Sequence, residues 1–156
     1  ASERLPFDDA SFDGISCIDS ILAFLDRSAV LHDWYRLLRP GGRALYTDPI
    51  VLTGIVSSEE IAMRSAIGNF MFVPPGENER LIRGAGFEIA AQEDVTANAA
   101  LVAKRWHDAR AGHREAMVQI EGEERFEGLQ RFFAMVHQVS AERRLSRFAF
   151  LLRKPA

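Results

Sequence analysis

The apolar positions along the chain alternate between short runs and stripes at helical spacing. Residues 13–19 form an apolar run that ends on an acidic residue, and residues 43–48 form a second run that ends in the same way. Between them, Asp26 is placed to cap a helix that runs to about Leu38. Its apolar stripe consists of Val30, Leu31, Trp34, Leu37 and Leu38. A strand, a helix and a strand in about 40 residues predict a right-handed crossover in a parallel sheet.

The same alternation continues after the second strand. A helix is expected from Ser57 to about Phe70, capped by Ser57 or Ser58 and with two glutamates in its first turn. A Pro-Pro-Gly sequence ends it, and residues 77–83 form a further short helix. Two glycines stop that helix, and residues 87–91 begin a third strand.

The alternation of strands and helices ends after residue 96. Residues 97–115 and 123–141 are long helical patterns with no strand between them, and 148–152 is a compact apolar strand. The two helical stripes are Val102, Trp106, His113 and Met117, and then Phe126, Leu129, Phe132, Phe133 and Val136. The pattern therefore predicts an α/β domain over residues 1–96 and 146–156, interrupted by a helical insertion over residues 97–145.

Composition narrows the function classes. The 156 residues are 47% hydrophobic and 26% charged, which fits one globular domain with a core. A net charge of −3 and scattered arginines argue against a nucleic-acid partner. The single cysteine excludes an internal disulfide framework and a cysteine-cluster zinc site, and no histidine pair has the spacing of metal ligands. Without a membrane-length apolar run or a signal peptide, a cytoplasmic location is expected.

Several segments in a fixed order carry a family resemblance. Leu5-Pro6-Phe7 precedes Ser11-Phe12-Asp13, Asp19 ends a strand, and Leu37-Leu38-Arg39-Pro40-Gly41-Gly42-Arg43 precedes the next strand. Gly84-Ala85-Gly86-Phe87 then precedes the third strand. Over about residues 1–95 and 146–155, the chain resembles the second half of class I S-adenosylmethionine-dependent methyltransferases. The resemblance implies a partial, Rossmann-like α/β sheet of later strands only, with an antiparallel last strand at 148–155 and an inserted helical lid.

Two features of that family have no counterpart in this sequence. They are the glycine-rich turn after the first strand and the acidic residue that binds the cofactor ribose. The resemblance places the family's first three strands before Ala1, so we expect a fragment that binds S-adenosylmethionine weakly or not at all. The strand at 13–19 would then lack its neighbour, and a homo-oligomer that covers this edge is expected.

The resemblance implies S-adenosylmethionine as cofactor and a small-molecule acceptor of its methyl group. The implied cofactor-binding residues are Ala1, Ser2, Leu5, Phe7, Asp19, Ser20, Ile21 and Phe24. Ligands of open α/β sheets lie beyond the carboxyl ends of the strands. The candidates to bind or deprotonate the acceptor are Asp19, Asp48 and His107, and the candidates to bind it from the lid are Trp106, Arg110 and His113.

Structural interpretations compete with these roles. An acidic residue at a strand end can cap the following helix, and Leu5, Phe7 and Trp106 can belong to an ordinary core. The three phenylalanines of the last helical stripe are read as packing residues. A second hypothesis for the whole chain is a noncatalytic half-domain, which acts as an interaction module or a pseudoenzyme.

Overall fold

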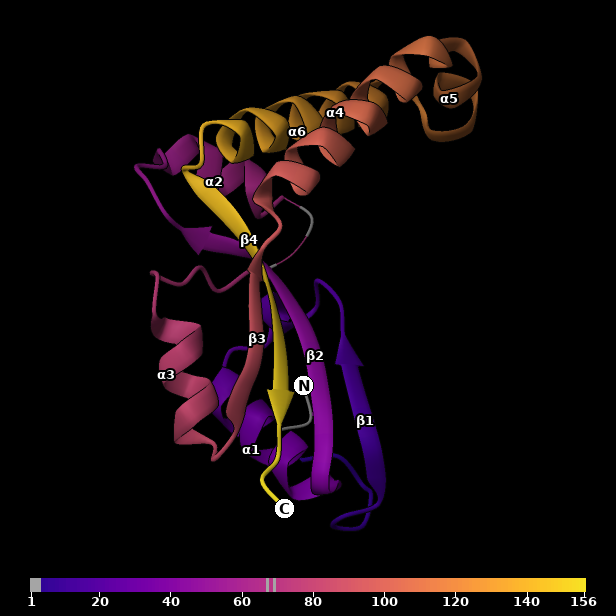
Figure 1. Ribbon diagram of the computed structural model, residues 1–156. Coiled ribbons are helices and arrows are strands. Elements are labelled where there is room, and N and C mark those ends of the chain that lie inside the picture. Colours follow the sequence, from indigo (N-terminus) through magenta and orange to yellow (C-terminus); the bar gives the residue numbers. More distant parts are fainter. Residues whose placement is uncertain (1–3, 67, 69) are drawn as a thin grey trace.

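The computed structural model describes residues 4–66, 68 and 70–156, and these form a four-stranded, open, mixed sheet (Figure 1). Strand β1 (Phe12–Cys17) runs parallel to β2 (Leu38–Leu52). The last strand, β4 (Leu145–Arg153), lies between β2 and β3 (Glu88–Asp94) and is antiparallel to both. The parallel crossover and the antiparallel last strand are thereby confirmed.

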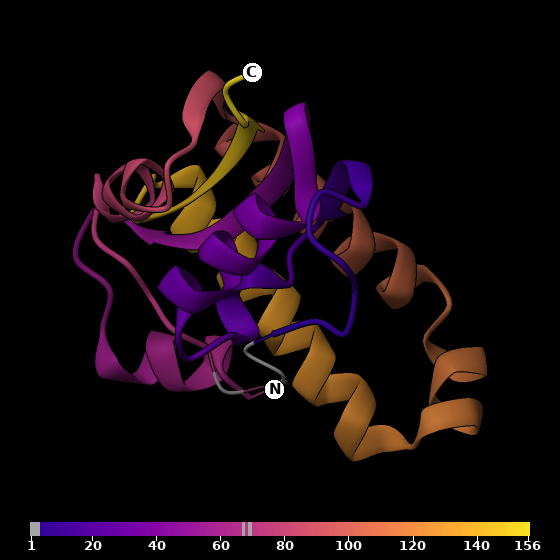
Figure 2. The same cartoon turned by 90° about the horizontal axis from the view of Figure 1, so that it is seen from below.

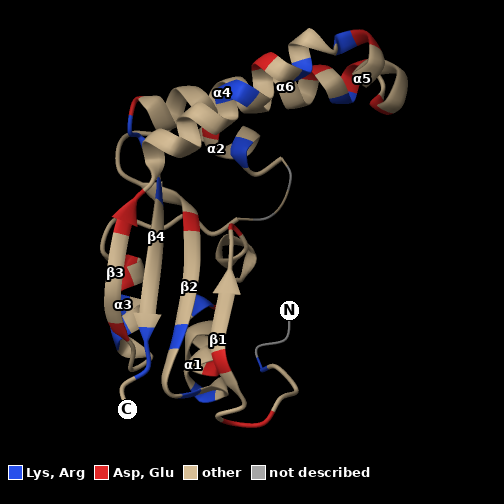
Figure 3. Cartoon of the chain, turned by 45° about the vertical axis from the view of Figure 1, so that its right-hand side comes forward, with Lys and Arg blue, Asp and Glu red and all other residues tan. Residues whose placement is uncertain are grey.

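One face of the sheet is covered by α1 (Arg27–Leu37) and α3 (Glu77–Gly84), as Figure 3 shows. The carboxylate of Asp26 accepts the Ala29 N–H at 2.8 Å, which confirms the expected helix cap. The predicted stripe of α1 is buried against the sheet, together with Ile82 of α3 and Tyr46 of β2. No described helix covers the opposite face (Figure 3). Leu45 alternates along β2 with the buried Ala44 and Tyr46 and is exposed.

Strand β2 begins five residues earlier than the sequence pattern indicates. Phe12 pairs with Leu38 and Gly14 with Arg43, so the intervening residues of β2 loop out as a turn. Gly41 has a φ of 77°, and a Cβ on Gly42 would lie 2.9 Å from the Arg39 carbonyl oxygen. This turn therefore requires its two glycines.

Helix α2 (Ser58–Arg64) is shorter than the expected helix over 57–70. The Met71 N–H donates at 2.9 Å to the carbonyl of Leu22, in the short 3₁₀ helix η1 (Ile21–Ala23). This tertiary bond draws the chain away from a helical path, and Phe70 packs into a core cluster with Leu22. Long-range packing thus overrides the local helical pattern.

Three helices lie across the end of the sheet at which β1 and β2 finish (Figure 1). The expected helix over 97–115 divides at His113 into α4 (Thr96–Gly112) and α5 (Arg114–Glu121), and α6 (Glu123–Ala141) runs back toward β4. Figure 2 shows α5 and the adjoining helix ends projecting beyond the sheet. None of the helices in the described part of the chain is long and apolar enough to cross a membrane.

The expected apolar stripe of α4 is not its packing face. Ala100 and Ala103 are buried, whereas Val102 is exposed and Trp106 keeps 57% of its surface. The Ala100 carbonyl lies 3.0 Å from His137 Nδ1 of α6, so the alanine side of α4 packs on α6 and the large apolar residues lie on a neighbouring face. The reading of Val102 and Trp106 as core residues is therefore wrong.

A buried polar network joins α1, β2 and α3. The Arg27 Nη1 donates to Asp48 Oδ2 at 2.6 Å and to Asn78 Oδ1 at 3.1 Å, and Nη2 donates to the Met71 carbonyl at 2.6 Å. The Asn78 amide donates to the same Asp48 oxygen at 2.7 Å. Asp48 Oδ1 also accepts the Ile50 N–H at 3.3 Å, and because Asp48 is 0% exposed, these partners replace water around its charge.

Helix α2 is fixed at its first turn. Ser57 and Glu60 form a reciprocal capping box, which confirms Ser57 as one of the two expected caps. Arg144 donates to both Glu60 carboxylate oxygens at 2.7 Å, and this pairing lowers the Glu60 pKa to about 2. The start of α2 is thereby tied to the turn that leads into β4.

We expect Asp48→Ala to destabilise the fold by roughly 3–5 kcal/mol, because it leaves the buried Arg27 charge without its carboxylate. Urea unfolding measures the change. Asp13→Ala removes an exposed ion pair with Arg39 and should cost less than about 1 kcal/mol. Equal losses in the two variants would contradict a special role for the buried pair.

A second prediction concerns pH. The folded-state pKa of Glu60 lies below its ordinary value of 4.5, so the stabilisation is present above pH 4.5 and disappears as pH falls toward 2. Glu60→Gln should therefore lower the free energy of unfolding at pH 7 and have little effect near pH 2. Glu59→Gln, on the exposed side of the same turn, is the matched control. A Glu60→Gln effect that is independent of pH would disprove the assignment.

Candidate functional site

A pocket of about 300 Å³ lies beyond the ends of β1 and β2, below α4 and α6. Its polar lining consists of Asp19, Arg64 and Arg147. Its aromatic lining consists of Phe70, Trp106, Phe132 and Phe133, and aliphatic residues complete the wall. A carboxylate, two guanidinium groups and aromatic rings therefore meet at the sheet edge where open α/β folds bind ligands.

Asp19 is held in a defined position at the pocket. Its backbone has a φ of 48°, which is uncommon for a residue other than glycine. The Asp19 N–H donates to Thr47 Oγ1 at 2.9 Å, and that hydroxyl donates back to Asp19 Oδ1 at 2.6 Å. The second oxygen lies 3.0 Å from Arg147 Nη2. With 43% of its side chain exposed, the carboxylate is oriented by the protein and still reachable by a ligand.

Arg64 enters the pocket from the end of α2 and is only 9% exposed. Its guanidinium carbon lies 5.2 Å from the centre of the Phe70 ring and 5.6 Å from that of Phe132. Its Nη1 is buried without a hydrogen-bond partner among the described residues. Burial lowers the Arg64 pKa, and the negative charges of Asp19 and Asp48 act in the opposite direction.

The aromatic wall is built from α4 and α6. Trp106 stacks on Phe133 with ring centres 5.7 Å apart, and Phe132 meets Phe133 edge to face at 5.5 Å. These rings give the pocket a broad apolar side. Phe132 and Phe133 are only partly buried, so they line the pocket in addition to packing.

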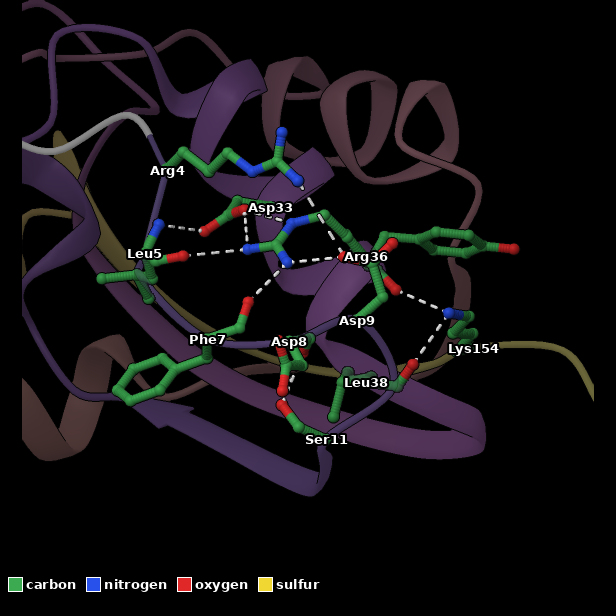
Figure 4. Close-up of polar contacts among 11 residues, drawn as sticks. Arg4, Leu5, Phe7, Asp8, Asp9, Ser11, Asp33, Arg36, Leu38 and Lys154 are labelled. Atoms are coloured by element: carbon green, nitrogen blue, oxygen red, sulfur yellow. Dashed lines mark hydrogen bonds and ion pairs between the residues drawn. The ribbon is translucent and has the colours of Figure 1, made fainter.

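The loop before β1 is fastened to α1 through its backbone (Figure 4). Arg36 donates to the carbonyls of Phe7 at 2.8 Å and Leu5 at 3.0 Å, and to Asp9 at 2.7 Å. Asp33 orients Arg36 and also accepts the Leu5 N–H at 2.8 Å. The side chains of Leu5 and Phe7 remain 37% and 51% exposed, so the network presents two apolar side chains on a fixed backbone.

The residues predicted for the cofactor have different placements. Ala1 and Ser2 lie outside the described residues. Ser20 is exposed, and its hydroxyl donates to the Ile18 carbonyl at 3.0 Å. Phe24 packs against the core, and the Ile21 side chain is fully buried in it. A cofactor contact by the Ile21 side chain is therefore contradicted.

The residues predicted for the acceptor do not form one cluster. Asp48 points into the core network, so direct contact with an acceptor is contradicted and its role is structural. His107 is on the surface of α4, where its Nδ1 lies 3.1 Å from Asp108, and it does not line the pocket of Asp19. Of the three lid candidates, only Trp106 reaches that pocket.

Arg110 and His113 line a separate apolar pocket of about 400 Å³ at the junction of α4 and α5, which Trp106 also borders. Arg110 is paired with Glu121 and lies over the Phe126 ring at 5.3 Å. These contacts hold the end of α4 against α5 and α6. Trp106 is the one described residue that lines both this pocket and the one that contains Asp19.

Sequence reasoning missed Arg64 and Arg147. The available signal for Arg64 was a charged residue three positions after Ile61, on the inward side of a short helix. Arg147 directly precedes the strand expected over 148–152 and gives no comparable signal. The sequence pattern indicates that Phe132 and Phe133 face inward, but it does not indicate that they line a pocket.

Sequence comparisons find relatives that match part of the chain. A family model described as "Methyltransferase domain" matches residues 1–46. The O-methyltransferase cnsE of Penicillium expansum is 33% identical over 94 residues, which are 60% of this chain and 34% of that protein. The 27-O-demethylrifamycin SV methyltransferase of Amycolatopsis mediterranei is 32% identical over 96 residues, 60% of this chain and 35% of that protein.

Solved structures share the fold over nearly the whole chain. Phosphoethanolamine N-methyltransferase 2 of Haemonchus contortus, in complex with S-adenosyl-L-methionine, superposes with a TM-score of 0.86 at 21% identity, over 96% of this chain and 35% of that one. The cyclopropane synthase MmaA2 of Mycobacterium tuberculosis gives 0.87 at 16%, over 95% and 57%.

The chain spans about a third of the length of the curated relatives cited above. Over this span, the sequence relatives are methyltransferases. The strand order β1-β2-β4-β3 includes the antiparallel last strand that the family resemblance leads us to expect. Residues 1–46 are thus similar in sequence to a methyltransferase domain, and the chain shares the fold of solved methyltransferase structures.

Proposed function

We propose that the chain provides the acceptor side of an active site for methyl transfer from S-adenosylmethionine to a small molecule. The observation that carries this proposal is the pocket beside Asp19, at the carboxyl ends of two parallel strands and below the helices α4 and α6. Curated relatives act as O- and N-methyltransferases, which supports an oxygen or nitrogen acceptor.

The residues present fit one side of a cofactor site. Leu5 and Phe7 offer exposed apolar surface on a backbone fixed by Arg36, which suits the flat adenine ring. Asp19 and Ser20 follow β1 directly and would border the methionine part of the cofactor. S-adenosylmethionine supplies a methyl group activated by its sulfonium.

The chain's own residues would align the acceptor and exclude water. The helical segment over 97–145 acts in this proposal as a lid, whose wall of Trp106, Phe132 and Phe133 removes solvent from the acceptor. Asp19 is the candidate to accept a hydrogen bond or a proton from the acceptor's O–H or N–H, because its carboxylate is oriented by Thr47 and remains reachable.

A noncatalytic interaction module is the second candidate function. Strand β1 pairs only with β2 in the described residues, so its other edge presents unpaired backbone groups. We expect the isolated chain to be a dimer or a larger assembly that covers this edge. Light scattering measures its mass, and a monodisperse monomer at all concentrations would contradict the expectation.

Cofactor binding tests the main proposal. Because no glycine-rich turn is present to hold the methionine part, we expect S-adenosylhomocysteine to bind with a dissociation constant on the order of 1 mM, observable by ligand-detected NMR. Arg36→Ala frees the loop of Leu5 and Phe7 and should weaken binding about tenfold.

Arg39→Ala removes only an exposed ion pair with Asp13 and serves as the control. Complete absence of binding would refute the proposed cofactor side, whereas micromolar binding measured by calorimetry would refute the expected weakness.

A further inference from the structure

The side chains that line the pocket of Asp19 do not balance in charge. Among its described lining residues are two guanidinium groups, Arg64 and Arg147, and one carboxylate, Asp19. The Asp19 carboxylate is already engaged by Arg147 and by the Thr47 hydroxyl. The pocket therefore carries one positive charge, that of Arg64, with no carboxylate in contact among the described residues.

A second buried arginine in the same fold, Arg27, has more polar partners, although its Nε also lacks one among the described residues. Arg27 is 5% exposed, close to the 9% of Arg64, and both of its terminal nitrogens donate to acceptors, including the carboxylate of Asp48. Arg64 has instead two aromatic rings beside its guanidinium and a buried Nη1 without an acceptor. Contacts with aromatic rings offset only part of the cost of burying a charge.

The position of Arg64 is fixed by contacts outside the pocket. The capping box of Ser57 and Glu60 sets the first turn of α2, and Arg144 clamps Glu60 from the turn before β4. Arg64 ends this short helix, one and a half turns later, and projects between Phe70 and Phe132. A buried guanidinium group that is held in place, lines a pocket and lacks an acceptor for one nitrogen can receive an acceptor from a ligand.

We propose that the methyl acceptor carries an oxyanion, a carboxylate or a phosphate monoester, which binds to Arg64 while its apolar body lies along Phe132, Phe133 and Trp106. This inference rests on the proposed function and adds the chemical class of the acceptor. The planar guanidinium can donate two parallel hydrogen bonds to either oxyanion. Arg147, whose buried Nε also has no partner among the described residues, lines the same pocket.

Trp106 provides a direct readout, because it lines this pocket whereas the second tryptophan, Trp34, is buried under the sheet. The full chain, without cofactor, is titrated with 3-phenylpropanoate, 3-phenylpropyl phosphate and the neutral 3-phenylpropanol while tryptophan emission is recorded. We expect at least one anion to bind about tenfold more tightly than the alcohol. The stronger of the two anions identifies the oxyanion.

Arg64→Gln should remove this preference, so that neither anion binds more tightly than the alcohol. Arg64→Lys, which keeps the charge but not the planar fork, should retain part of the preference, and thermal unfolding of both variants checks that they fold. Arg105→Gln is the matched control, because Arg105 is exposed and lines only the neighbouring pocket at α4 and α5. Trp106→Phe should abolish the change in tryptophan emission on ligand binding.

Equal affinities for the alcohol and both anions, or an anion preference that survives in folded Arg64→Gln, would overturn the proposal. Loss of the preference in Arg105→Gln instead would assign the anion to the other pocket and would equally overturn it. These outcomes are independent of the titration with S-adenosylhomocysteine, so failure of anion recognition and failure of the proposed function are distinguished.

Discussion

The buried pair of Arg27 and Asp48 joins four segments that are distant in the sequence: the start of α1, the middle of β2, the start of α3 and the chain at Met71. Thr47 precedes Asp48 and holds Asp19 at the pocket, while Asp48 holds the helices on the covered face. Successive residues of a strand point to opposite sides, so one dipeptide fixes both the core and the site. The geometry of the pocket depends on this network because β2 can be displaced only if a buried charge loses its partners.

Two further attachments complete the walls of the site. The Arg36 network holds the backbone of the loop before β1, so that exposed apolar side chains on this loop stay in place without being buried themselves. On the other side, α4 packs on α6 through its alanine side, and the large aromatic residues face the pocket. In both walls, polar or small residues provide the attachment and apolar residues provide the surface for a ligand.

Much of the fold could be predicted because its signals are local. Alternation of apolar runs and stripes, the Asp26 cap and the Ser57 cap each act within a few residues. The site could be predicted only in part. Asp19 and Asp48 occupy equivalent places in the sequence pattern, each at the end of an apolar run. Their environments differ because Arg27 and Asn78, which are distant in the sequence, bind the Asp48 carboxylate. Arg64 escaped notice for the same reason, since its neighbours Phe70 and Phe132 are brought together only by packing.

The helices α4 to α6 leave the sheet and return to it at almost the same point. Asp94 at the end of β3 pairs with Phe148 of β4, and Thr96 exchanges hydrogen bonds with the backbone of Arg147. An excursion that starts and ends beside itself can change in length or sequence without shifting the register of any strand. Changes in α4 to α6 can therefore alter which ligands the pocket accepts. The strands and the loop before β1 need not change with them.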